Sequence, residues 1–268
     1  MALIDAHCHA SPLWFEPVEP LIFQMDQNGV SKAVLTQVLG QFDNSYHEAC
    51  IARFPGRLAS VGTIDTGLPD APERVRHWAA RGMVGLRLRP DVRSSGADPL
   101  MIWRAAADSG LSISVGGAAA NIISEAFADL AETFSQMDFV VEQLGGWTRP
   151  DCDGSSATLR AILRLARFPN VSAKIPTLGQ MAPRQIGRPL PQDGPVLDAS
   201  EGEILLEALD AFGAERLLWG SDFPVVASRE GYANALNWTR EIFDGRPKME
   251  IDAIFGGNAE RIFFARSG

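Results

Sequence analysis

Short apolar runs alternate with longer amphipathic segments from one end of the chain to the other. The runs are rich in Val, Ile and Leu, and several end in Gly, Pro, Asp or Thr, which is typical of strands buried in a parallel sheet. The segments between them carry apolar residues at helical spacing. The runs predict eight strands, at residues 3–9, 32–38, 58–64, 83–90, 111–117, 138–145, 170–175 and 216–222.

Strands that are each followed by a helix favour a single (β/α)8 barrel of the TIM type, with a C-terminal helix, over residues 1–268. An open doubly wound sheet is the alternative. No strand is followed by the glycine pattern that a nucleotide site in such a sheet needs. The clearest helices are expected at 71–81, 99–109, 121–134, 155–167, 201–212 and 231–243, and the last at about 250–264.

The composition limits the kinds of partner and compartment. Hydrophobic residues make up 46% of the chain, so a large core is available, yet no run is apolar enough to span a bilayer. The net charge of −9 argues against nucleic acid or an anionic membrane as the main partner. Three cysteines without a CxxC pair, and no signal peptide at the start, favour a reduced, cytoplasmic protein. The oligomeric state stays open, a homo-oligomer included.

The first expected strand carries the densest group of polar side chains. Asp5, His7 and His9 alternate with small or apolar residues, so in a regular strand the three share one face. Two imidazoles two residues apart can both reach one cation or one substrate. The alternative is a set of polar residues at a solvated terminus. We expect His7 and His9 at the functional site.

Asp222 is the strongest further candidate, because catalytic residues of such a barrel lie at the C-terminal ends of its strands. It follows an apolar strand, between Gly-Ser and Phe-Pro. In that position it could accept a proton from water or bind a metal ion. The alternative is an ordinary turn or helix-capping aspartate.

Three basic side chains and one amide complete the expected site. Arg87 and Arg89 alternate on the fourth strand, where they could grip a carboxylate or pair with acidic neighbours at the rim. Lys174 lies in an otherwise small or apolar run, so it either has a carboxylate partner or points into the wet mouth of the barrel, which we favour. Gln143 in the sixth strand could bind substrate. The irregular stretch 177–199 after the seventh strand could be a lid or a plain surface loop.

Several short motifs resemble those of the amidohydrolase superfamily, and most closely its amidohydrolase 2 branch. They are DAHCH at the start, GLRLRP, EQLGG, NVSAKI and WGSDFP at the fourth, sixth, seventh and eighth strands, and FGGNAERIF near the end. They occur in the order and spacing of the family over nearly the whole chain. The branch holds lactonases and zinc-dependent decarboxylases. The resemblance implies a TIM-like barrel with Asp222 as catalytic acid/base and His7 and His9 as metal or substrate ligands.

Two positions depart from the pattern of that family. Gly116 and Gln143 stand where the family commonly has histidines, at the fifth and sixth strands. Of the usual ligand set only His7, His9 and Asp222 remain. Three protein ligands and a water could hold one divalent ion, zinc or manganese, and a metal-free site is equally open.

These residues predict a hydrolase that opens an anionic lactone or a similar cyclic ester. Asp222 would be the general base on water, His7 and His9 would stabilise the oxyanion, and cationic side chains with Gln143 would bind the substrate. Two alternatives stay open. One is a metal-dependent decarboxylase of an unsaturated or aromatic acid. The other is a non-catalytic barrel that has lost its metal ligands.

Overall fold

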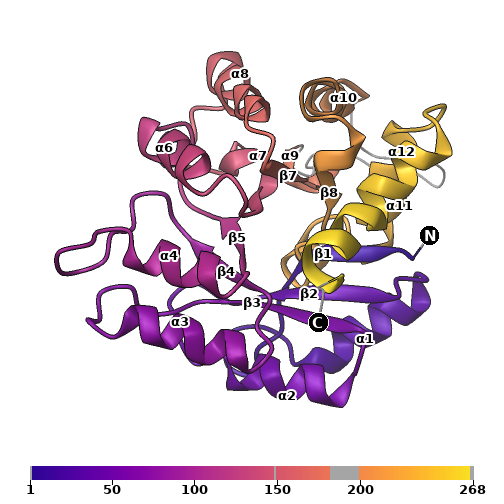
Figure 1. The fold of residues 1–268 in the computed structure, drawn as a ribbon. Helices are drawn as coiled ribbons and strands as arrows, with labels where there is room; N and C mark the ends of the chain where they lie inside the picture. Colours follow the sequence, from indigo (N-terminus) through magenta and orange to yellow (C-terminus); the bar gives the residue numbers. More distant parts are fainter. Residues whose placement is uncertain (1, 148, 182–198, 266–268) are drawn as a thin grey trace.

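The structure of the chain, a computed structural model, describes residues 2–147, 149–181 and 199–265. Eight parallel strands form one sheet in which each strand pairs with the next along the chain, and the sheet curls into a nearly closed barrel. Figure 1 shows the strands at the centre with the helices around them. The predicted (β/α)8 barrel is confirmed. The strands are β1 (Ile4–Cys8), β2 (Lys32–Thr36), β3 (Leu58–Gly62), β4 (Gly85–Leu88), β5 (Ser112–Val115), β6 (Phe139–Val141), β7 (Val171–Ile175) and β8 (Leu217–Trp219).

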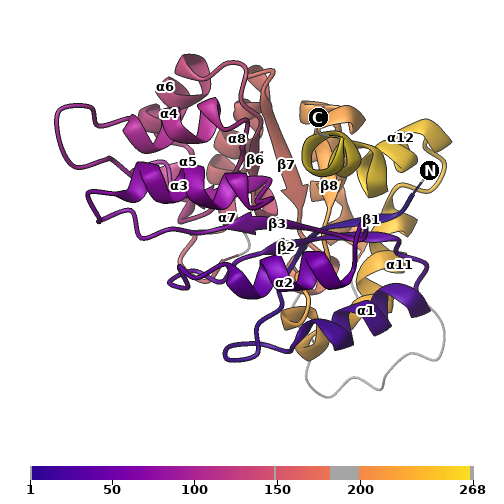
Figure 2. The same ribbon diagram turned by 60° about the horizontal axis from the view of Figure 1, so that its bottom comes forward.

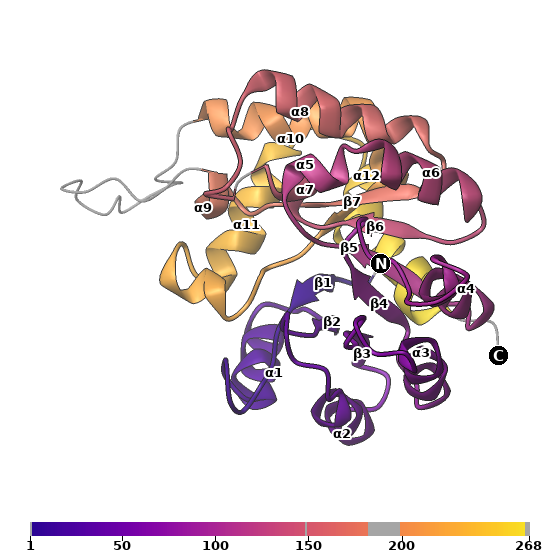
Figure 3. The same ribbon diagram turned by 90° about the vertical axis from the view of Figure 1, so that its left-hand side faces the viewer.

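The helices of the described residues lie around this barrel and at the ends of its strands. They are α1 (Val18–Gln27), α2 (Ser45–Arg53), α3 (Ala71–Ala80), α4 (Met101–Asp108), α5 (Ala119–Ile122), α6 (Glu125–Thr133), α7 (Gln143–Gly146), α8 (Ser156–Leu163), α9 (Leu178–Met181), α10 (Ala199–Phe212), α11 (Tyr232–Ile242) and α12 (Lys248–Asp252). Figure 3 shows α1 to α4 around one half of the ring of strands and α6, α8, α10 and α11 around the other. None of the helices in the described ranges has the length and apolar character needed to cross a membrane.

Two apolar clusters hold the barrel together. The larger one fills the layer between strands and helices, with Trp103, Phe127 and Trp219 fully buried in it. The smaller one fills the barrel interior and combines strand residues such as Val34 with Phe263 from the C-terminal segment. That segment, yellow in Figure 2, lies beside β8. The interior is therefore packed at its N-terminal end, which leaves the C-terminal ends of the strands for a site.

The structure differs from the sequence prediction in the details of several elements. The helix expected at 121–134 is two helices, α5 and α6, because the Ser124 hydroxyl accepts a hydrogen bond from the Phe127 N–H and begins a new helix there. The last helix is regular only in α12 and continues as π-helical turns. The start of the stretch 177–199 forms α9, and residues 182–198, where a lid was one interpretation, lie outside the described residues.

The barrel closes where β1 meets the segment after β8. The backbone N–H of Asp222 donates to the carbonyl of His7 (2.8 Å), and that of His9 donates to the carbonyl of Phe223 (2.7 Å). Gly220 permits this approach, because a Cβ atom built there would lie 2.6 Å from the Cβ of His7 and 2.8 Å from its backbone nitrogen. The closure therefore determines where His7, His9 and Asp222 lie relative to one another.

A buried carboxylate strengthens the same closure. Asp5 accepts hydrogen bonds from the backbone N–H (2.9 Å) and hydroxyl (2.6 Å) of Ser221, from the Tyr232 hydroxyl (3.0 Å) and from the His7 N–H (3.1 Å). Burial raises the pKa of this carboxyl, although each of these hydrogen bonds opposes the shift. Asp5 thus ties β1 both to the segment after β8 and to α11.

The prediction that the polar side chains of β1 share one face is wrong. The pairing of β1 with β2 shifts in register between Asp5 and Cys8. Asp5 consequently contacts Tyr232 on α11, whereas His7 contacts Lys174 in β7. Strict alternation holds only for a regular strand, and a local irregularity aims side chains elsewhere.

Replacing the buried carboxylate tests its role in the closure. Asp5→Asn keeps the size of the side chain but turns an NH2 group toward hydrogen-bond donors. We expect the free energy of unfolding to fall by about 2–3 kcal/mol, measured by urea titration. Asp26→Asn is the matched control, because Asp26 pairs with Arg57 at an exposed site and little change is expected there. An equal loss in both variants would contradict this role of Asp5.

Candidate active site

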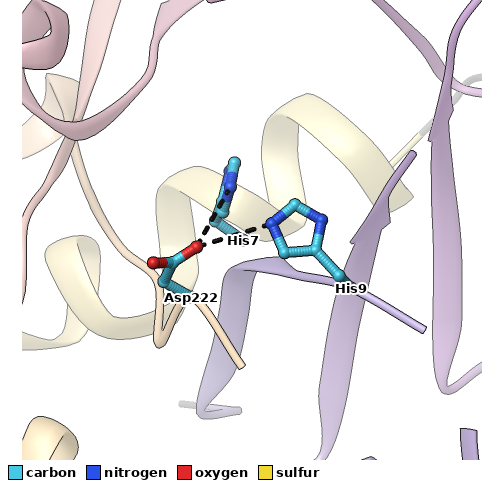
Figure 4. A group of neighbouring side chains, drawn as sticks. All are labelled: His7, His9 and Asp222. Carbon is cyan, nitrogen blue, oxygen red and sulfur yellow. Dashed lines mark ion pairs between the residues drawn. The ribbon is translucent and has the colours of Figure 1, made fainter. Parts of the chain in front are cut away.

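Three side chains converge where the barrel closes. Figure 4 shows His7 and His9 on the first strand segment facing Asp222, which follows β8. The Oδ1 atom of Asp222 lies 3.4 Å from Nε2 of His9 and 3.9 Å from Nε2 of His7. All three residues are buried, and one ligand atom of each lies within 4.8 Å of the others. The structure thus brings together the three residues that the sequence predicted to be catalytic.

His9 is oriented by the backbone of the neighbouring strand. Its Nδ1 lies 2.6 Å from the carbonyl oxygen of Thr36, which can only accept, so Nδ1 carries the proton. The ring of Phe15 stacks on the imidazole, with centroids 5.2 Å apart. In the neutral ring the Nε2 lone pair faces the carboxylate of Asp222. Two acceptors therefore face each other, an arrangement that a water molecule or a cation can bridge.

Asp222 is held by one of its two oxygens. Its Oδ2 accepts hydrogen bonds from Nε2 of Gln180 (3.1 Å) and from Nη1 (3.2 Å) and Nη2 (3.3 Å) of Arg229. Its Oδ1 is left facing the two histidines. The backbone φ of 59° is in the left-handed region, which is uncommon for residues other than glycine and is often found at functional sites.

The sequence did not identify these two partners of Asp222. Gln180 lies in α9, at the start of the stretch that has no clear pattern, and Arg229 lies in the loop before α11. No spacing or motif distinguishes them from other polar residues in loops. A cation a few residues after Asp222 is the one signal that could have indicated Arg229.

Lys174 lies in the barrel interior, in contact with His7. Its Nζ is 3.1 Å from Nδ1 of His7 and 3.2 Å from Oγ of Ser114, and 5.7 Å from the ring centroid of Phe263. The residue is 1% exposed, so the prediction that it points into a wet mouth is wrong. Burial lowers the pKa of Lys174 to about 8, although the nearby Glu142 carboxylate opposes the shift.

The contact with Lys174 determines which nitrogen of His7 carries its proton. A lysine with a pKa of about 8 is mainly an ammonium at neutral pH, and an ammonium can only donate. Burial, followed by the charge of Lys174, lowers the pKa of His7 well below its ordinary value, so this ring is neutral. Nδ1 of His7 then accepts from Lys174, and its Nε2–H points toward Asp222. His7 and His9 are therefore opposite tautomers.

A buried ion pair lies beside these groups. Arg87 donates from Nε (2.8 Å) and Nη2 (2.7 Å) to the two oxygens of Glu142, and its Nη1 donates to the Gln37 carbonyl (3.0 Å). Ser114 also donates to Glu142 (2.7 Å) and so connects it to Lys174. Burial alone would raise the pKa of the Glu142 carboxyl, but the charges of Arg87 and Lys174 hold it far below its ordinary value.

This ion pair explains one departure from the family pattern. A Cβ atom built on Gly116 would lie 3.0 Å from Oε2 of Glu142 and 3.6 Å from Nε of Arg87. The Arg87–Glu142 pair therefore fills the space that a histidine side chain at this position would need. No role was predicted for Glu142, although it lies next to Gln143 in the expected sixth strand.

The other two predicted substrate-binding residues lie apart from these contacts. The Arg89 side chain is 58% exposed and pairs with Asp91 (3.0 Å). Gln143 follows β6 with a φ of 46°, is half-buried, and forms no side-chain hydrogen bond within the described part of the chain. The structure does not bring Arg87 and Arg89 to a common partner. Their predicted binding of a substrate, like that of Gln143, stays a prediction.

Comparison with known families agrees with the fold and with the position of the site. The sequence profile described as amidohydrolase matches residues 4–265. The chain belongs to the amidohydrolase family. The match includes the DAHCH and GSDFP segments that supply His7, His9 and Asp222.

Crystal structures of similar fold cover almost the whole of this amidohydrolase. An amidohydrolase from Burkholderia multivorans with bound zinc has a TM-score of 0.76 at 20% identity, over 98% of this chain and 99% of that chain. A structure from Pseudomonas putida described as a 2-pyrone-4,6-dicarboxylic acid hydrolase has 0.75 at 20%, over 97% of each chain. One from Acinetobacter baumannii, described likewise and with citric acid bound, has 0.73 at 17%, over 98% and 99%. No curated protein matches this sequence.

Members of this superfamily commonly bind a divalent metal ion, and His7, His9 and Asp222 agree with such a site in number and spacing. Nε2 of His9 and Oδ1 of Asp222 are both free to act as ligands. Nε2 of His7 is not, because it carries the proton while Lys174 donates to Nδ1. As the side chains stand, two ligands are available where a catalytic zinc usually has three. An ion held by all three residues would therefore require the His7 proton to leave Nε2.

The buried ion pair can be tested by removing one charge. Glu142→Gln keeps the size of the side chain but leaves Arg87 and Lys174 without their carboxylate. We expect the free energy of unfolding to fall by about 3–5 kcal/mol in urea titration. Asp91→Asn is the matched control, since it breaks the exposed Arg89–Asp91 pair and should change stability little. A Glu142→Gln protein as stable as wild type would contradict the buried pair.

Proposed function

We propose that this amidohydrolase opens a lactone or a similar cyclic ester by attack of water, with Asp222 as the general base. The observation that carries the proposal is that the two oxygens of the Asp222 carboxylate have different partners. Oδ2 accepts hydrogen bonds from Gln180 and Arg229, whereas Oδ1 has neither of these partners and faces Nε2 of His9 at 3.4 Å and Nε2 of His7 at 3.9 Å. A base must have a free oxygen at the place where water binds, and Oδ1 meets that requirement.

The tautomers of the two histidines suggest different tasks. A water molecule can donate one hydrogen to Oδ1 of Asp222 and the other to the Nε2 lone pair of His9, which aims its oxygen lone pairs at a carbonyl carbon. The Nε2–H of His7 can donate to the carbonyl oxygen and stabilise the oxyanion that forms. Lys174 is a positioning residue here, because its ammonium keeps the His7 proton on Nε2.

The reaction then runs in two steps. The water oxygen bonds to the carbonyl carbon, and its proton passes to Asp222, which gives a tetrahedral oxyanion. When the ring C–O bond breaks, the protonated Asp222 returns the proton to the leaving alkoxide, and the product is a hydroxy acid. A divalent ion, when bound, would supply Lewis-acid polarisation of the carbonyl, but no step above depends on it.

The comparisons support a lactone as the substrate class. Two structures of similar fold are described as 2-pyrone-4,6-dicarboxylic acid hydrolases, and a 2-pyrone is a cyclic ester. Their identity to this chain is 20% and 17%, so the likeness concerns the fold, and the substrate remains part of the proposal.

Removing the proposed base tests this assignment. Asp222→Asn should lower kcat by about 10³-fold on a lactone that the wild type opens, because the amide cannot take the proton from water. The rate of ring opening would be followed by acid release at constant pH. Asp65→Asn is the control, since Asp65 lies after β3 at the same end of the barrel and, among the described residues, its side chain accepts a hydrogen bond only from the backbone N–H of Gly67 (3.0 Å). An Asp222→Asn enzyme that keeps a large fraction of the turnover would refute Asp222 as the base.

The proposed effect of Lys174 on the tautomer of His7 can be tested through the affinity for zinc. Lys174→Met removes the charge beside His7 and frees Nδ1, so the ring proton can move there and expose Nε2 as a third ligand. We expect zinc to bind this variant at least about tenfold more tightly than wild type, measured by competition with a chromophoric chelator. Met in place of Lys keeps most of the volume of the buried side chain. The additional replacement His7→Ala should abolish the gain.

The wild-type titration separates the proposal from its main rival. A metal-dependent decarboxylase needs a firmly held ion, so wild-type protein that already binds one equivalent tightly, and loses it in His7→Ala, would favour the decarboxylase and contradict the tautomer of His7 inferred here.

A further inference from the structure

Exposed apolar side chains gather beside the candidate active site. Nine large hydrophobic side chains are exposed among the described residues, and four of them lie in the two loops that follow β1 and β2. These loops leave neighbouring strands at their C-terminal ends, next to His9 and its partner carbonyl at Thr36. The four are Leu13 (83% exposed), Trp14 (64%), Leu39 (52%) and Phe42 (44%), and we call them the apolar rim.

The loop after β1 is held by hydrogen bonds of its own and connects this rim to the catalytic groups. The hydroxyl of Ser11 accepts from the backbone N–H groups of Leu13 and Trp14, at 3.3 Å each. The Ser11 N–H donates to the Glu16 carbonyl (2.9 Å). In the same loop the Phe15 ring stacks on His9. Phe15 therefore connects the loop that carries Leu13 and Trp14 to the imidazole of His9.

The cations at the site already have partners. Arg87 is paired with Glu142, and Arg89 with Asp91. Arg229 is paired with Asp222 and lies 3.5 Å from the buried Glu230 carboxylate. A substrate carboxylate at any of these cations would lie beside a carboxylate that the cation already binds, and the two like charges repel each other. The gain from such a contact is therefore small.

Lys174 does not offer an alternative binding site for a substrate carboxylate. It is buried under His7 and is connected to Glu142 through Ser114. A substrate anion would have to enter the barrel interior to reach it. The balance of charge at the site thus favours a substrate without a carboxylate, and the apolar rim favours one with an apolar substituent.

We propose that the substrate is an uncharged lactone that carries an aryl or bulky alkyl group, which packs on Phe15 and the apolar rim while the ring carbonyl lies between His7 and Asp222. This inference rests on the proposed lactone hydrolysis and names its substrate class. It replaces the anionic lactone that the arginines of the sequence led us to expect. It also sets this chain apart from the similar structures described as hydrolases of a dicarboxylic acid.

The experiment compares three δ-lactones with the wild-type protein. They are 3,4-dihydrocoumarin, a derivative of it that carries a carboxylate on the aromatic ring, and unsubstituted δ-valerolactone. The hydrolysis of each is followed by acid release. We expect kcat/KM to be highest for 3,4-dihydrocoumarin, and at least about tenfold lower for the carboxylate derivative. A preference for the carboxylate derivative would overturn this inference and leave the proposed hydrolysis standing. Hydrolysis of none of a wider set of lactones would refute the proposed function, and the substrate class with it.

Variants of the apolar rim test where the substituent binds. Trp14→Ala should lower the ratio of kcat/KM between 3,4-dihydrocoumarin and δ-valerolactone by about tenfold, mainly through KM. Phe23→Ala is the matched control, because Phe23 is an aromatic side chain of similar exposure (60%) in α1 and lies outside the rim; it should leave the ratio unchanged.

The main rival is that a second copy of the chain covers the rim. Sedimentation of wild type and Trp14→Ala distinguishes the two. An unchanged lactone ratio, together with a dimer that Trp14→Ala dissociates, would overturn the inference and identify the rim as a contact between copies. The expected result is a changed ratio with the same oligomeric state in both proteins.

Discussion

The pairing of β1 with the segment after β8 is the constraint on which the candidate site depends. Two backbone hydrogen bonds, from Asp222 to the His7 carbonyl and from His9 to the Phe223 carbonyl, place residues from opposite ends of the chain side by side. The same bonds hold Asp222 in a left-handed backbone conformation, which a non-glycine residue keeps only when its surroundings determine it. Closure of the barrel and assembly of the site are thus one structural event.

Three buried carboxylates lie near this closure, and their partners give them different roles. Asp5 is saturated by hydroxyl and N–H donors and acts as a structural acceptor. Glu142 is neutralised by Arg87 on both of its oxygens. Asp222 alone of the three has a cation on one oxygen and none on the other. The number of free acceptor positions, more than burial itself, marks Asp222 as the group that can take a proton.

The sequence predicted the features that depend on local patterns. The alternation of strands and helices predicted the barrel, and the spacing of His7, His9 and Asp222 at strand ends predicted a cluster that the structure brings together. Pairing of Arg87 with an acidic neighbour was only one of two interpretations, its partner Glu142 was not predicted, and neither was the burial of Lys174. Both features depend on contacts across β4 to β7, and alternation along one strand says nothing about the strand opposite.

The two histidines at the end of the first strand segment, His7 and His9, differ in their chemistry. The Thr36 carbonyl can only accept, and the Lys174 ammonium can only donate, so the proton sits on Nδ1 in His9 and on Nε2 in His7. One ring therefore offers a lone pair to the site and the other offers an N–H. A metal ion needs lone pairs from both, whereas an attack of water on a carbonyl needs one acceptor and one donor. The hydrogen bonds behind the two rings thus favour carbonyl chemistry at this site over a tightly held ion.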